Sequence, residues 1–96
     1  MIKIIVERRI MPGLEEEYEQ AARDAMRQSL GARGFVGGES LVELGHNDRR
    51  LMITKWRDLR AWKEWYTSET RTRVMQRLQP LLTEEERIRI YEPGSH

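Results

Sequence analysis

The sequence predicts an α+β fold of the ferredoxin-like type, a split βαβ sandwich with the element order β-α-β-β-α-β. β-branched residues open the chain, an amphipathic helical pattern follows them, and two strand-like segments around a turn come next. A broken second helix and a strictly alternating strand over residues 87–92 complete the order. We therefore expect one domain over residues 1–93 and a short tail over 94–96.

The first strand, Ile2 to Ile10, carries apolar residues on both faces. Ile4 and Val6 lie on one face, and Ile5 lies on the other face beside Glu7. A strand with one face in solvent alternates more cleanly between apolar and polar residues. We expect helices to cover one face and the sheet of a second copy to cover the other.

Apolar residues recur at helical spacing from Leu14 to Leu30, which predicts an amphipathic helix. The three glutamates at positions 15–17 fall in its first turn, where carboxylates interact favourably with the helix dipole. Helix capping explains them better than metal binding does. Gly31 and Gly34 end this helix and open the second strand.

The second strand is expected from Phe35 to Leu44 and the third from Arg50 to Trp56, joined as an antiparallel hairpin by a turn at residues 45–48. His46 lies at the tip of this predicted turn. We expect a solvated loop residue there, because no second histidine nearby supports a metal site.

The chain after the third strand predicts two short helices. Asp58 is suited to cap a helix that ends near residue 66, and Ser68 is suited to cap another over residues 69–79. Pro80 lacks a backbone N–H and should end the second of these helices.

Composition excludes several classes of protein. Lysine and arginine number 17 against 16 acidic residues and the charges are interspersed, which argues against nucleic-acid binding. There is no cysteine for a thiolate metal site or a disulfide. No apolar run reaches the ~18–20 residues of a membrane span. We expect a cytoplasmic protein, and give His96, in the tail, no role.

The three tryptophans, Trp56, Trp62 and Trp65, fall within ten positions. They can line a pocket that stacks a planar aromatic ligand. They can equally fill the space between sheet and helices as ordinary core residues. The sequence leaves both interpretations open.

Several short motifs occur in an order that resembles the antibiotic biosynthesis monooxygenase family. They are Pro12-Gly13, the glutamate-rich first helix, Gly34-Phe35, the strand end Ile53-Thr54-Lys55-Trp56, the aromatic helix after it, and the closing Ile90-Tyr91-Glu92. The resemblance covers roughly residues 1–92. It implies a dimeric α+β barrel, a homodimer in which two four-stranded sheets pack face to face, with a pocket between each sheet and its helices.

The resemblance also implies roles for single residues. Members that oxidise aromatic polyketides without a cofactor use a tryptophan at the end of the third strand, which Trp56 matches, and an aromatic residue in the next helix, matched by Trp62. Those members carry an asparagine where this chain has Met52 and an arginine near Gln76. Met52 cannot hydrogen-bond a developing oxyanion as an amide can.

Glu7 is a candidate general base that would take the proton of a phenol, with its pKa raised by burial beside the tryptophans. The alternative is a carboxylate paired with Arg9 or Lys3. Haem-degrading members use an asparagine on the first strand and a histidine that ligates the iron, and this chain has Glu7 and Met75 at those two positions. Trp65 matches a tryptophan that these members also use. In this chain haem would have to be held by the thioether of Met75, which is a weaker ligand than histidine, or would not be held at all.

The resemblance thus implies a cofactor-independent monooxygenase that oxidises a small aromatic or quinone-like molecule with O2. The alternatives are a haem-binding protein without the ligating histidine and a non-catalytic ligand-binding or stress-response module. Arg71, Arg73 and Arg77 are expected on a solvent-exposed helix face. The expected catalytic residues are Trp56 and Glu7, and the expected pocket residues are Met52, Trp62, Trp65 and Met75.

Overall fold

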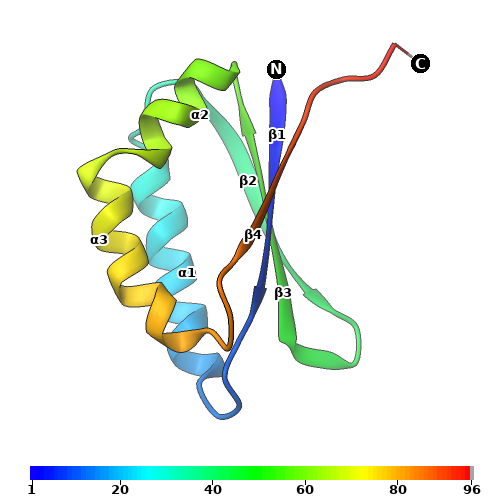
Figure 1. Cartoon of the computed structure of the whole chain (residues 1–96), viewed down its shortest axis with the longest axis vertical. Coiled ribbons are helices and arrows are strands. Elements are labelled where there is room, and N and C mark those ends of the chain that lie inside the picture. Colours follow the sequence, from blue (N-terminus) through cyan, green and yellow to red (C-terminus); the bar gives the residue numbers. More distant parts are fainter. Residues whose placement is uncertain (96) are drawn as a thin grey trace.

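The computed structural model describes residues 1–95, and these form two layers (Figure 1). One layer is a four-stranded sheet and the other consists of helices that cover one face of it. The opposite face of the sheet carries no helix (Figure 1). In chain order the elements are β1 (Ile2–Arg9), α1 (Glu15–Ser29), β2 (Phe35–Glu43), β3 (His46–Trp56), α2 (Leu59–Tyr66), α3 (Glu69–Leu78), η1 (Gln79–Leu81) and β4 (Arg87–Tyr91).

The sheet has the strand order β2-β3-β1-β4, and all neighbouring strands are antiparallel. Val6 of β1 lies opposite Met52 of β3 and Ile88 of β4. This topology, with the second helix divided into α2 and α3, confirms the predicted ferredoxin-like α+β fold.

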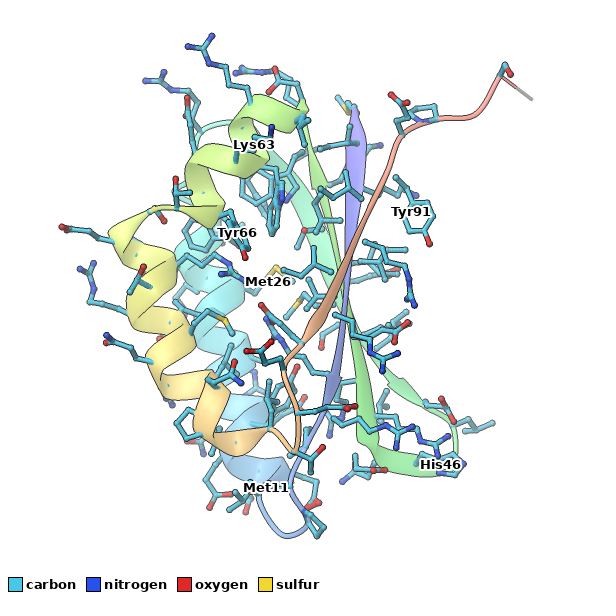
Figure 2. All side chains as sticks on the ribbon, viewed as in Figure 1. Met11, Met26, His46, Lys63, Tyr66 and Tyr91 are labelled. Atoms are coloured by element: carbon cyan, nitrogen blue, oxygen red, sulfur yellow. The ribbon has the colours of Figure 1, made fainter. Side chains whose placement is uncertain are left out.

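The hairpin between β2 and β3 is tighter than the sequence predicts. The turn contains only Leu44 and Gly45, so the turn predicted at residues 45–48 is wrong, and His46 pairs with Glu43 as the first residue of β3. Gly45 has φ +84°, a conformation that glycine adopts without steric cost. Figure 2 shows His46 at the hairpin end, away from the helices.

Capping side chains fix both short helices. The Asp58 carboxylate accepts a hydrogen bond of 2.9 Å from the backbone N–H of Ala61, and the Ser68 hydroxyl accepts one of 3.1 Å from that of Arg71. Both predicted caps are confirmed. Pro80 lies in the 3₁₀ turn η1, so α3 ends before this proline as expected. Its last residue is Leu78, one position before the predicted end.

The core lies between the sheet and the helices. Tyr18 and three alanines of α1 are buried against it, and the small side chains let this helix approach the sheet closely. The sheet contributes alternate residues of its two central strands. They are Ile4, Val6 and Arg8 of β1 and Arg50, Met52, Thr54 and Trp56 of β3.

The helix-free face of the sheet is apolar at its centre and charged around it. Ile5, Leu51 and Ile53 are half-buried there, and Leu41 is exposed. The predicted apolar character of both faces is therefore confirmed, while the homodimer that would cover this face stays a prediction.

Candidate functional site

A small cavity lies between the sheet and the helices, at the tryptophan-rich end of the core. Its walls come from β1, α1, β3, α2 and α3. Its volume is about 50 Å³, enough for a few waters. It is lined by Val6, Arg8, Ala25, Met26, Ser29, Met52, Thr54, Trp56, Trp62, Trp65, Arg71, Val74 and Met75.

The tryptophans form one cluster around the fully buried Trp56. The ring of Trp62 meets it edge-on with 5.8 Å between centroids, and that of Trp65 stacks on it at 6.2 Å and 29°. Phe35 packs against Trp56 at 5.1 Å. Such contacts add to the stabilisation from burial. The tryptophans thus belong to the core and line the cavity together, so the two interpretations of the sequence are compatible.

The indole N–H of Trp56 has a partner inside the protein. It donates a hydrogen bond of 2.9 Å to the hydroxyl of Thr54, two residues earlier on the same face of β3. Trp56 therefore presents its ring, and not a free donor, to the cavity. The sequence interpretation did not give Thr54 this role.

Three methionines supply part of the remaining apolar wall. Met52 and Met75 lie at the cavity as expected, and Met26 of α1 joins them. Met26 lies between the helices and the sheet, whereas Tyr91 points from the opposite side of the sheet (Figure 2). A Cβ at Gly38 would come within 2.9 Å of the Met26 methyl group, so this glycine makes room for Met26.

Glu7 does not reach this cavity. Side chains alternate along β1, and because Val6 and Arg8 face the helices, Glu7 faces the helix-free side. There it forms an ion pair with Arg89 of β4, which raises the pKa of the Arg89 guanidinium. The expected placement of Glu7 beside the tryptophans is therefore wrong, and its partner is neither Arg9 nor Lys3.

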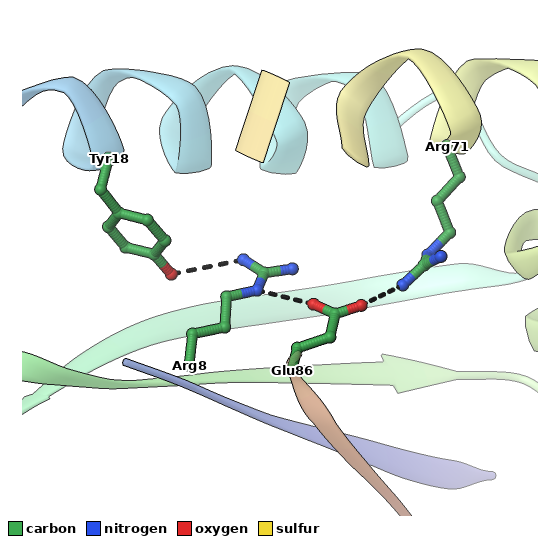
Figure 3. A network of polar contacts seen from close by, with 4 residues as sticks. All are labelled: Arg8, Tyr18, Arg71 and Glu86. Carbon is green, nitrogen blue, oxygen red and sulfur yellow. Dashed lines mark hydrogen bonds and ion pairs between the residues drawn. The ribbon is translucent and has the colours of Figure 1, made fainter. Parts of the chain in front are cut away.

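One wall of the cavity is charged. The Arg8 guanidinium lies 2.8 Å from one oxygen of Glu86, and Arg71 hydrogen-bonds the other oxygen of the same carboxylate (Figure 3). Arg8 also donates a bond of 3.3 Å to the phenol oxygen of Tyr18. Burial alone would lower the pKa of Arg8, but Tyr18 and Glu86 outweigh this effect and leave the pKa above its ordinary value.

Arg71 corrects another expectation. Its side chain is only 13% exposed, and its Cζ atom lies 4.4 Å from the ring centroid of Tyr66 and 6.0 Å from that of Trp62. Its placement on a solvent face is wrong, whereas Arg73 and Arg77 are exposed as expected. A signal for Arg8 does exist, because it continues the buried alternation of Ile4 and Val6.

The family model of the antibiotic biosynthesis monooxygenases matches residues 1–77. The chain belongs to this family. Solved structures agree in fold. An antibiotic biosynthesis monooxygenase superposes with a TM-score of 0.88 at 15% identity, covering 98% of this chain and 99% of that one. A conserved protein from Methanosarcina mazei Go1 gives 0.90 at 18% identity, with 97% and 92% covered.

SnoaB, a cofactor-independent oxygenase from Streptomyces nogalater, superposes with a TM-score of 0.86 at 18% identity, covering 99% of this chain and 95% of that one. At such identities the likeness concerns the fold alone. A search of the curated proteins finds no match to the sequence.

The antibiotic biosynthesis monooxygenase match includes every residue that lines the cavity but ends before Glu86. Within residues 1–95, no group of three or more histidine, cysteine, aspartate or glutamate side chains could hold a metal ion. No helix of this described part is both long and apolar enough to cross a membrane. His96 lies outside the described residues.

Proposed function

We propose that the protein is a cofactor-independent monooxygenase that oxidises a small aromatic or quinone-like molecule with O2 in the tryptophan-lined cavity. The observation that carries the proposal is the meeting of three tryptophans and three methionines with a charged wall in one cavity. Membership of the antibiotic biosynthesis monooxygenase family supports the reaction class. The fold shared with SnoaB, a cofactor-independent oxygenase, is consistent with it.

The reaction needs no external reductant. Loss of a proton from a phenol makes an electron-rich anion that can react with O2. One oxygen atom bonds to a ring carbon, which loses its hydrogen and becomes a carbonyl carbon, and the other oxygen atom leaves as water with this hydrogen and the phenolic one. The substrate thus supplies all four electrons that reduce O2, and becomes a quinone.

The tryptophans would contribute shape in this reaction. The rings of Trp56 and Trp62 offer surfaces against which a planar substrate packs, and exclude water from the reacting carbon. Because Glu7 lies on the other face of the sheet, its carboxylate is not the base in this proposal. The proton would pass to water at the cavity mouth.

The cavity must widen before it can hold such a ligand, since ligand pockets usually measure ~300 Å³ or more. Trp65 and Met75 are partly exposed cavity residues, so their side chains have room to move outward. A haem, which is larger still, would require the helices to separate from the sheet.

A non-catalytic ligand-binding module is the second candidate function. The bond from Trp56 to Thr54 favours it, because this indole N–H is not free to stabilise a reacting anion. In this alternative the cavity would still bind an aromatic ligand, but the ligand would leave unchanged.

We also propose that the helix-free sheet face binds the same face of a second copy. Leu41 is 42% exposed and Tyr91 is 49% exposed on this face, and an apolar sheet centre is typical of an interface. Arg49, also on this face, has a buried Nε atom without a hydrogen-bond partner in residues 1–95. Because the chain's own atoms cover this Nε atom, a second subunit could reach it only if the Arg49 side chain moved.

The test is titration of tryptophan fluorescence with phenols, quinones and haemin while dissolved oxygen is recorded. Saturable quenching by a phenol with oxygen uptake, and one ¹⁸O atom from ¹⁸O2 in the product, would support the oxygenase. Trp56→Phe should impair turnover, whereas Glu7→Gln, on the far side of the sheet, should leave it unchanged. Quenching without oxygen uptake would establish the binding module instead.

A further inference from the structure

The charged wall of the cavity carries more positive than negative charge. Arg8 and Arg71 both bind Glu86, and this is the one carboxylate within ion-pair distance of either in residues 1–95. The side chains of Arg8 and Glu86 are 7% and 9% exposed, and that of Arg71 is 13% exposed. Two guanidiniums and one carboxylate leave one positive charge in a nearly buried group.

Such a charge is unfavourable in a protein interior unless it is paired. The neighbouring group at α1 is balanced, because Arg50 has its own carboxylate, Glu19. Tyr18 accepts a hydrogen bond from Arg8 through a hydroxyl group and adds no carboxylate to the pair. The excess positive charge therefore remains at Arg8 and Arg71, and both of these residues line the cavity.

We propose that the cavity selects ligands that enter as anions, and that Arg71 is the residue that binds the anionic oxygen. The ligand class would be planar aromatic molecules with an ionised oxygen, such as acidic phenols and hydroxyquinones. The inference rests on the proposed function, because it concerns the same ligand cavity, but it does not require that the ligand be oxidised there. It makes Arg71 a specificity-determining residue.

Arg71 is better placed for this role than Arg8. Arg8 divides its donors between Glu86 and Tyr18, whereas Glu86 is the only side-chain hydrogen-bond partner of Arg71 in residues 1–95. A guanidinium has five N–H donors, so most of those on Arg71 stay available. The Arg71 Cζ atom lies 4.4 Å from the centroid of the Tyr66 ring, a cation–π contact that restrains the guanidinium beside the cavity.

The experiment compares two planar probes of nearly equal shape. 2-Hydroxy-1,4-naphthoquinone is an anion at pH 7, and its methyl ether, 2-methoxy-1,4-naphthoquinone, is neutral. Binding of each is measured by calorimetry and tryptophan quenching at low ionic strength. The proteins are the natural chain, Arg71→Gln, Arg71→Lys and, as a matched control on the exposed face of the same helix, Arg73→Gln.

We expect the natural chain to bind the anion at least about tenfold more tightly than the ether, as one hydrogen-bonded charge pair provides. Arg71→Gln should remove this preference and change binding of the ether less than about twofold. Arg71→Lys should restore part of the preference, and Arg73→Gln should keep all of it. The comparison of the two probes on the natural chain tests anion selection even if a variant fails to fold.

Equal affinities for both probes, or a preference that survives in Arg71→Gln, would overturn the role of Arg71 and leave the proposed oxygenase standing. Failure of both probes to bind would overturn the anion-selective cavity. Oxygen uptake with other phenols would still decide the proposed function separately. Turnover of neutral substrates alone would count against anion selection but in favour of the oxygenase.

Discussion

Thr54 accepts the only hydrogen bond that the indole N–H of Trp56 makes within residues 1–95, at 2.9 Å in the buried interior. Thr54→Val should therefore lower the free energy of unfolding by about 1–3 kcal/mol, because a buried donor loses its partner. Thr54→Ser keeps the hydroxyl and should cost about 1 kcal/mol or less. Urea denaturation followed by tryptophan fluorescence measures both. Equal stability of the two variants would show that the bond contributes nothing.

Glu86→Gln should destabilise the protein strongly. The substitution leaves Arg8 and Arg71 without a negative partner in a nearly buried position, and breaking such a group typically costs about 3 kcal/mol or more. Glu85→Gln, at the adjacent exposed position, is the matched control and should stay within about 0.5 kcal/mol of the natural chain. A small effect at Glu86 would mean that water or a dissolved anion replaces its carboxylate.

Gly34→Ala should be more destabilising than Gly13→Ala, although the two glycines share nearly the same φ, +82° and +88°. Both alanines incur about 1–2 kcal/mol for the left-handed backbone. A Cβ at Gly34 would also lie 2.4 Å from the Cβ of Ala61, which adds about 1–3 kcal/mol of overpacking. Nothing lies within 4 Å at Gly13. The difference in thermal unfolding between the two variants would measure the cost of crowding Ala61 of α2 at the start of β2.

Ile53→Asp should convert the expected dimer into a monomer. Ile53 lies on the helix-free face, where a carboxylate would be buried between two sheets without a partner. Leu59→Asp, at an exposed apolar position on α2, should leave the dimer intact. Sedimentation equilibrium at micromolar concentration measures both. A natural chain that is itself monomeric would contradict the proposed interface.

The local elements could be predicted from the sequence because their signals are local. Asp58, Ser68 and Pro80 act within one helical turn, and the alternation of β1 is read along a single strand. The sequence misplaces the hairpin turn because the asparagine and aspartate at positions 47 and 48 are residues favoured in turns. In the structure Arg50 holds Asn47 through its side-chain and backbone oxygens at the start of β3.

The site was only partly predictable, because its geometry depends on distant pairings. The cavity positions of Met52, Trp62, Trp65 and Met75 follow from strand and helix periodicity. Alternation along β1 puts Glu7 on the face opposite Val6, but both faces carry apolar residues, so no local pattern shows which of them the helices cover. The alternation of Ile4 and Val6 indicates that Arg8 is buried, but its carboxylate partner lies 78 positions away and could not be inferred from neighbouring residues.

The carboxylate that offsets part of the positive charge at the cavity lies outside the part of the chain that the family model matches. Glu86 follows the matched region by nine positions, between η1 and β4. Two homologues that agree fully over residues 1–77 can therefore differ by one unit of charge at the cavity wall. Divergence just before the last strand could retune ligand preference within the family, while every tryptophan and methionine around the cavity stays the same.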